Sequence, residues 1–195
     1  MGPDTKKRIR DPEARRAAIL AAARSVFAER GYVKATIRQI AQRAGVTHGL
    51  VVLHFSSKEE LFLAAVPGTR DLGESVQGDV EGLAGRVARA YVARMESADS
   101  ADPFIALVRG AADDQDSAKA LLRAMREKSI SAYLTVLDGA DVPLRVDLLG
   151  AHLIGVTFSR YVLADGPIAA MSPDELTDYL TMSLRGILLG CPGRP

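Results

Sequence analysis

The chain of 195 residues has one cysteine, no tryptophan and no long uncharged hydrophobic run. The single cysteine, Cys191, excludes an intramolecular disulfide and is typical of a reducing compartment. We expect no segment to cross a membrane, because that requires about eighteen consecutive apolar residues. The charged N-terminus lacks the apolar core of a secretory signal. These absences predict a folded cytoplasmic protein.

Motifs for catalysis and metal binding are missing as well. The sequence contains no H-E-x-x-H, C-x-x-C or G-x-S-x-G pattern and no glycine-rich phosphate loop. His48 and His54 lie six residues apart, so they would not share one helix face as paired metal ligands do. We therefore predict no catalytic residue, no metal and no cofactor, and infer that the protein is not an enzyme.

Charge is distributed unevenly along the chain. The whole sequence holds 25 Lys and Arg against 24 Asp and Glu, a net charge of +1. Residues 1–58 hold 12 of the basic and 4 of the acidic residues, a net charge of +8, so the remainder carries −7. Phosphate contacts supply most of the sequence-independent affinity for nucleic acid. A solvated charged surface, the alternative, would spread both signs evenly, so the charge pattern favours a nucleic-acid-binding N-terminal part.

The stretch from Thr36 to Lys58, TIRQIAQRAGVTHGLVVLHFSSK, predicts two short helices joined by a tight turn. Thr36 and Gln39 have the spacing of a capping box that opens the first helix. Gly45 ends that helix, because glycine adopts a left-handed conformation without a steric penalty. Thr47 then caps the second helix.

The second of these helices would bury Val51 and Phe55 and leave small, polar and apolar side chains outside. A short helix that follows a tight glycine turn and exposes such side chains fits a DNA major groove. We interpret the stretch as a helix-turn-helix.

The same stretch resembles the DNA-binding signature of TetR/AcrR-type bacterial transcriptional regulators, T-[IV]-R-x-I-A-x-x-A-G-V-[ST]-x-G-x-[LV]-x-x-H-F-x-[SN]-K-x-x-L. The matching residues are Thr36, Ile37, Arg38, Ile40, Ala41, Ala44, Gly45, Val46, Thr47, Gly49, Val51, His54, Phe55, Ser57, Lys58 and Leu61. The resemblance covers the N-terminal third of the chain. It departs at Val52, where the family usually has a tyrosine that touches DNA.

The resemblance implies a set of contacts to a double-stranded DNA operator. Base-edge or thymine-methyl contacts are expected from Arg38, His48, Gly49, Leu50 and Leu53, and phosphate contacts from Thr36, Thr47, His54 and Lys58. Val52 belongs to the same recognition surface. Because Leu50, Val52 and Leu53 make this surface apolar, methyl contacts and DNA shape should carry a large share of the specificity.

The pattern divides the chain into two domains. Residues 1–66 would form the helix-turn-helix domain, with a basic arm at 1–10 and a bracing helix that starts at Asp11-Pro12 and ends at Gly31. Ser57 and Glu60 predict a second capping box and a further helix. Residues 67–78 hold one proline and three glycines and predict a linker. Residues 79–195 would form the second domain.

Apolar residues recur at helical spacing throughout the second domain, without strand-like alternation. We expect helices over 79–97, 103–110, 117–138, 143–164 and 173–190. The predicted fold is all-α: an N-terminal three-helix helix-turn-helix DNA-binding domain followed by a C-terminal helical ligand-binding and dimerisation domain.

The last two predicted helices are apolar on more than one face, so they must be covered on both sides. The family uses its last two helices as a four-helix dimer interface; a two-sided core within one chain is the alternative. The candidate interface residues are Gly150, Ile154, Tyr161, Leu180, Leu184, Ile187 and Leu188.

The resemblance also implies a small-molecule effector in the larger domain. Candidate lining residues are Tyr91, Met95, Phe104, Met125, Tyr133, His152 and Phe158. We expect few buried charges there, which favours an apolar or aromatic molecule. The leading interpretation is a homodimeric repressor that the effector releases from a palindromic operator. The alternatives are an activator or effector-independent DNA-binding protein whose second domain only dimerises, and an enzyme or interaction module that carries a helix-turn-helix.

Overall fold

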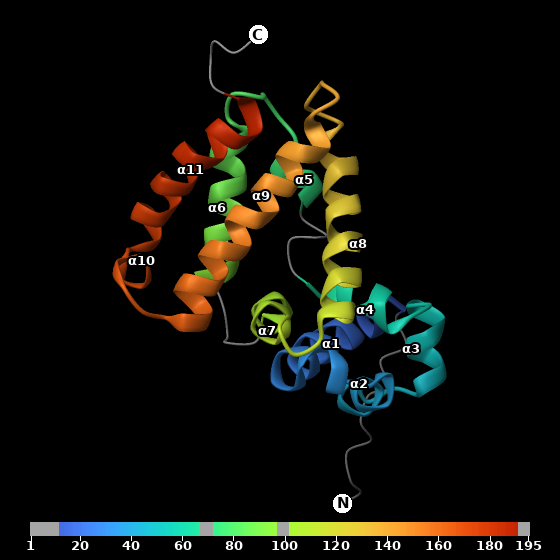
Figure 1. The fold of residues 1–195 in the computed structure, drawn as a ribbon. Helices are drawn as coiled ribbons and strands as arrows, with labels where there is room; N and C mark the ends of the chain where they lie inside the picture. The colour runs from blue at the N-terminus through green and yellow to red at the C-terminus, as the bar shows by residue number, and fades with distance from the viewer. Residues whose placement is uncertain (1–11, 67–71, 97–101, 191–195) are drawn as a thin grey trace, which may run out of the picture.

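The computed structural model describes residues 12–66, 72–96 and 102–190. Within these ranges the regular structure consists of eleven α-helices and one π-helical segment, with no strand (Figure 1). The all-α prediction is confirmed. The predicted basic arm at 1–10, the helix cap Asp11 and Cys191 lie outside the described ranges.

Four helices form the N-terminal part: α1 (Pro12–Lys34), α2 (Ile37–Ala44), α3 (His48–His54) and α4 (Lys58–Ala65). Helix α1 bends at Gly31, where φ is 71° and ψ is 169°, and one more turn follows to Lys34. The predicted helix end at Gly31 is therefore a kink. A left-handed φ of this kind suits glycine, which has no Cβ to clash.

The sequence-based caps of α2 and α3 are confirmed. The Thr36 hydroxyl accepts a hydrogen bond from the Gln39 backbone N–H at 3.2 Å, and the Gln39 side chain accepts one from the Thr36 N–H at 3.0 Å. Gly45 ends α2 with φ 67° and ψ 29°. The Thr47 hydroxyl accepts from the Leu50 N–H at 3.3 Å.

The predicted capping box of α4 forms only in part. The Ser57 hydroxyl accepts from the Glu60 N–H at 3.0 Å, as expected. The Glu60 carboxylate, however, accepts from the N–H of Ser56 at 3.1 Å and not from that of Ser57. The acid therefore satisfies a donor one residue before the cap, so the prediction of a reciprocal box was wrong.

The C-terminal part contains α5 (Leu72–Val76), α6 (Leu83–Glu96), α7 (Pro103–Gly110), α8 (Gln115–Tyr133), α9 (Val142–Thr157), the π-helical η1 (Phe158–Leu163), α10 (Pro167–Ala170) and α11 (Pro173–Leu189). Helix α5 lies inside the segment predicted as a linker, because Val76 is buried in the core that α6 helps to form. Helices α6, α9 and α11 run through the upper half of Figure 1, and α8 stands beside α9.

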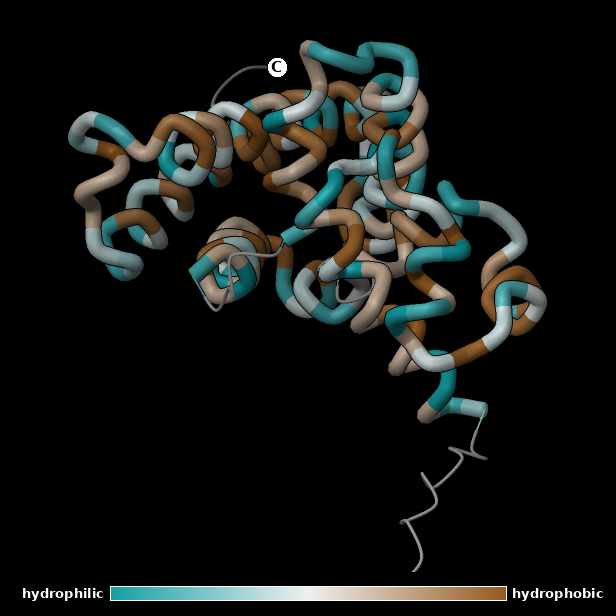
Figure 2. Tube along the Cα trace, turned by 90° about the horizontal axis from the view of Figure 1, so that it is seen from below, coloured by the Kyte–Doolittle hydropathy of each residue, from teal (hydrophilic) through white to brown (hydrophobic). Residues whose placement is uncertain are grey.

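The hydrophobic core has two parts. One holds buried residues of α1 to α4 together with Phe104 and Leu107 of α7 and Ala118 and Leu121 of α8. The other is built from α6, α9, α11 and the C-terminal end of α8. Hydrophobic and hydrophilic residues alternate along most helices, as an amphipathic bundle requires (Figure 2). Helix α7 and the start of α8 are thus packed onto the N-terminal helices.

Among the described residues, one stretch, Val142–Leu163, is long and apolar enough to cross a membrane by length and composition alone. It contains Arg145, Asp147 and Arg160, so it is not an uncharged apolar run of the kind that the sequence lacks. In the structure it covers α9 and η1, and α9 packs against α8 and α11. Val146 and Leu149 are buried there, so we treat α9 as a core helix of the bundle.

Candidate nucleic-acid interface and the adjacent cavity

Helix α3 presents a partly apolar surface after the glycine turn. Val51 and the C-cap Phe55 are buried, as predicted. On the outer face, 79% of Leu53 and 40% of Val52 are exposed. Of the other predicted contact residues, Thr47, His48 and Gly49 are exposed, and Leu50 and His54 are half-buried. These side chains therefore share one accessible surface.

Thr36 and Arg38 extend this surface at the start of α2, where both are exposed. Arg43, on the last turn of α2, instead forms a two-pronged ion pair with Glu29 of α1, with an Nη2–Oε2 distance of 2.9 Å. The hydrogen bond from Arg43 lowers the pKa of Glu29, so the carboxylate stays charged. This pair fixes α2 against α1.

Lys58, another predicted phosphate contact, interacts with the end of α1. Its ammonium group donates to the Val33 carbonyl oxygen at 3.2 Å and sits 4.3 Å from the centre of the Tyr32 ring. Partial burial lowers the pKa of Lys58, and the nearby Asp114 carboxylate opposes that shift. The side chain is therefore turned towards α1, which the signature alone does not reveal.

Helix α1 also supports the end of α3. The guanidinium carbon of Arg16 lies 5.1 Å from the centre of the Phe55 ring, a cation–π distance. Pattern analysis did not find this contact, because Arg16 and Phe55 are far apart in the sequence.

A cavity of about 1550 Å³ lies among α1, α6, α8 and α9, with Phe104 of α7 at its wall. Four of the predicted lining residues, Tyr91, Phe104, Met125 and Tyr133, line it. The Tyr91 hydroxyl pairs with the Thr157 hydroxyl at 2.9 Å, and burial raises the pKa of Tyr91 to about 12. The phenol is thus neutral throughout the physiological range.

Three predicted lining residues lie elsewhere. Met95 is packed inside the C-terminal core. His152 Nε2 lies 3.1 Å from the Ser183 hydroxyl of α11, and 42% of Phe158 is exposed to solvent. Helical periodicity does not show which face of α6 or α9 borders the cavity, and none of these three residues lines it as predicted.

The cavity wall is more charged than expected. Asp102 is 6% exposed and accepts two hydrogen bonds from Arg94, at 2.8 and 3.0 Å. Four further lining residues are cations on α8: Lys119, Arg123, Arg126 and Lys128. The expectation of few charges near the pocket does not hold.

The candidate dimer residues divide between three places. Leu180, Leu184 and Leu188 have no exposed surface and pack within the C-terminal core of their own chain. Gly150 and Ile154 line the cavity, and the Tyr161 hydroxyl donates to Glu96 at 2.7 Å. Ile187, like Tyr161, is half-buried at the edge of that core.

A different set of apolar residues faces outward on the last helices. On α11, 72% of Met182 and 40% of Tyr179 are exposed. On α9, Leu148 is half exposed and Gly155 has open space around its Cα. The assignment of Leu180, Leu184 and Leu188 to an interface is corrected: the residues between them on α11 form the accessible face.

Two family models match the chain. Residues 19–65 match the model described as "Bacterial regulatory proteins, tetR family". Residues 81–188 match the one described as "Tetracyclin repressor-like, C-terminal domain". Together the matches cover α2 to α4 and most of α1, and the bundle from α6 to α11.

Similar proteins agree with these matches. A stretch of 50 residues is 50% identical to the HTH-type transcriptional repressor AcnR of Corynebacterium diphtheriae, over 26% of each chain. A stretch of 52 residues is 50% identical to the HTH-type transcriptional activator FasR of Mycolicibacterium smegmatis, over 27% of this chain and 24% of FasR. The matched stretch thus spans about a quarter of the length of these curated relatives.

Similarity over the full length is found with a solved structure. The structure of a TetR-family regulator (SCO0857) from Streptomyces coelicolor A3 superposes with a TM-score of 0.67 at 29% sequence identity. The superposition covers 97% of this chain and 99% of that one.

Proposed function

This chain belongs to the TetR family of bacterial regulatory proteins, and on that premise we propose that it is a DNA-binding transcriptional regulator rather than an enzyme. More specifically, we propose a homodimeric cytoplasmic repressor that a small molecule releases from a palindromic operator. The observation that carries the proposal is the exposed surface of α3 after the left-handed turn at Gly45.

The proposed DNA contacts are those predicted from the signature. The exposed residues of α3, with Arg38 and Thr36 of α2, would enter and flank the major groove. Because Leu53 and Val52 are exposed and apolar, they suit thymine methyl groups more than base-edge acceptors. Lys58 would reach a phosphate only by leaving Tyr32, so its contribution depends on a side-chain movement.

Dimerisation would use the outward face of α9 and α11. Met182 and Tyr179 of α11 are large apolar side chains exposed to solvent, and burying them against a second copy would be favourable. Small residues, Gly155 and Gly186, have open space around them and permit close approach of a second copy. Two α3 helices about 34 Å apart would then read two half-sites of one palindrome.

Ligand binding in the cavity could be coupled to DNA binding through α7. Phe104 lines the cavity and also belongs to the core that α7 shares with α1. A ligand that fits only one position of α7 would favour one spacing of the two heads, and differential affinity of this kind is what shifts an equilibrium. The proposed effector has an apolar body, because most of the cavity wall is apolar.

The sign of regulation has two candidates. AcnR is described as a repressor, and FasR, which is as similar over its matched stretch, is described as an activator. We propose repression as the leading function and activation as its alternative.

The experiment is a selection of genomic fragments with the purified full chain, followed by a reporter fused to the best fragment. An enriched palindrome and a reporter that is silenced by the protein would support the repressor. Reporter activation would favour the alternative, and the absence of any enriched site would contradict both.

A further inference from the structure

We propose that the cavity binds an amphipathic anion, with an apolar chain between the helices and a carboxylate or phosphate head against Lys119 and Arg123 of α8. The inference rests on the proposed function, because it names the chemical class of the effector.

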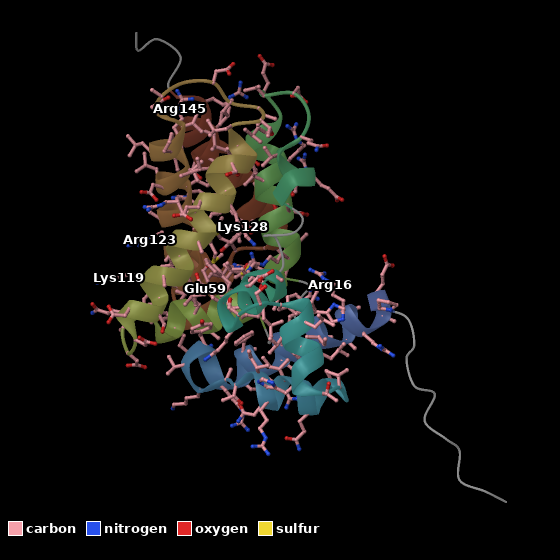
Figure 3. The ribbon with its side chains drawn as sticks, turned by 90° about the vertical axis from the view of Figure 1, so that its right-hand side faces the viewer. Arg16, Glu59, Lys119, Arg123, Lys128 and Arg145 are labelled. Atoms are coloured by element: carbon pink, nitrogen blue, oxygen red, sulfur yellow. The ribbon has the colours of Figure 1, made fainter. Side chains whose placement is uncertain are left out.

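A stripe of cations lies along one face of α8. Lys119, Arg123 and Arg126 have the spacing i, i+4 and i+7, so they share a face, and all three line the cavity while remaining exposed. Figure 3 shows Lys119 and Arg123 projecting on the same side of the helix. Like charges at this spacing destabilise a helix slightly. A bound anion would relieve that repulsion.

Among the described residues, one carboxylate forms an ion pair with this stripe. Asp147 of α9 lies 3.2 Å from Arg126. In the described part of the chain, no carboxylate lies within salt-bridge distance of Lys119 or Arg123. These two cations are thus available for an anionic group at the edge of the cavity.

Apolar side chains follow directly behind the cations. Leu122 of α8 and Leu149, Leu153 and Ile154 of α9 line the same cavity. Leu148, next to Asp147, lines it as well and is half exposed. An apolar wall beside unpaired cations favours a ligand with two unlike ends over a wholly apolar one.

A buried hydroxyl without a partner lies beside the cavity. Tyr133, at the end of α8, lines the cavity and has no exposed surface. Its hydroxyl has no hydrogen-bond partner in the described part of the chain. A buried donor without an acceptor is unfavourable; because the hydroxyl itself has no exposed surface, a ligand oxygen would gain this hydrogen bond only if the side chain turned towards the cavity.

The first test compares three probes with the same tail by calorimetry on the full chain. Dodecanoate, dodecanol and dodecyltrimethylammonium carry a negative, a neutral and a positive head, and each is kept below its micelle concentration. We expect dodecanoate to bind at least about tenfold more tightly than either of the others, with an affinity that falls as salt rises. Equal binding of dodecanol, or tighter binding of the cation, would overturn the proposal.

Variants locate the anionic head. The double variant Lys119→Gln with Arg123→Gln should weaken dodecanoate binding about tenfold and leave dodecanol binding unchanged. The matched control, Arg89→Gln with Arg109→Gln, removes two exposed cations that do not line the cavity and should change neither. Equal losses in both double variants would mean a general charge effect and would contradict the assigned site.

A hydrogen bond from the Tyr133 hydroxyl to the ligand is tested separately, by comparing the affinities of related carboxylates. Among twelve-carbon carboxylates with a keto oxygen at successive positions, at least one should bind more tightly than dodecanoate. Tyr133→Phe should abolish that preference and keep the affinity for dodecanoate itself. A preference that survives the substitution would remove Tyr133 from the site.

Failure of this inference is distinguishable from failure of the proposed function. The operator affinity of the ligand-free chain, measured by anisotropy without any probe, tests the proposed function by itself. Release of operator by dodecanol but not by dodecanoate would keep an effector-responsive repressor and reject the anion. Selective dodecanoate binding with unchanged operator affinity would keep the site and reject its role as an effector site.

Discussion

Lys58 and Tyr32 form a cation–π contact that ties the first residue of α4 to the end of α1, with the ammonium nitrogen 4.3 Å from the ring centre. A hydrogen bond from the same ammonium to the Val33 carbonyl oxygen strengthens the contact. The signature position that the family assigns to a DNA phosphate therefore has a packing role in the free protein.

Lys58→Ala should affect both roles. Losing the cation–π contact and the hydrogen bond should lower the free energy of unfolding by about 1 kcal/mol. If the side chain also reaches a phosphate, the affinities for operator and for non-operator DNA should fall by the same factor. The slope of log affinity against log salt concentration should then become shallower by about 1. Thermal unfolding and anisotropy titrations measure the two effects. Lys34→Ala, on the last turn of α1, is the matched control, and selective loss of operator binding would contradict a phosphate role.

Val52→Tyr restores the residue that the family usually has on the recognition helix. Val52 is 40% exposed, so the larger side chain has room. A new hydrogen bond to DNA should tighten operator binding about threefold to tenfold, since one such bond contributes roughly 0.5–1.5 kcal/mol. Val80→Tyr is the control, because Val80 is 41% exposed and lies outside the N-terminal helices. Weaker binding of Val52→Tyr would indicate that the operator is suited to the apolar surface.

The helix caps show which features of the fold can be predicted from the sequence. Thr36, Gly45 and Thr47 were placed correctly because a cap depends on neighbours within four residues. The start of α4 at Lys58 was predicted as well, but the contacts of its side chain with Tyr32 and Val33 were not, because these partners belong to another helix.

For the last helix, the sequence does not predict which residues are buried. Helix α11 is apolar on two faces, and its pattern does not tell which face meets α6 and which remains open. Leu180 and Leu184 were assigned to a dimer interface, yet they fill the core. The position of Arg123 at the cavity could not be predicted from the sequence either. The cavity forms between α8 and α9, which are separate in the sequence and pack together only in the folded chain.

Leu184→Ala tests the corrected assignment of that residue to the core. Leu184 has no exposed surface, so the substitution should lower the free energy of unfolding by about 2–5 kcal/mol. Chemical denaturation measures this. A change below about 0.5 kcal/mol, as expected for an exposed position, would contradict the assignment.

Met182→Glu tests the outward face of α11. Met182 is 72% exposed, so a charge there should leave the folded chain intact while opposing the burial of this face against a second copy. Sedimentation velocity should show a dimer for the wild type and for the control Met182→Leu, and a monomer for Met182→Glu. A dimeric Met182→Glu would place the interface elsewhere.

A dimer of this chain should recognise its operator through the two copies of α3. The most direct test is an anisotropy titration of the wild-type chain on the enriched genomic fragment, repeated over a range of salt concentrations. We expect two chains per site and a logarithm of affinity that falls steeply and linearly with the logarithm of salt concentration. One chain per site, or binding that does not distinguish the fragment from a scrambled sequence at any salt concentration, would contradict it.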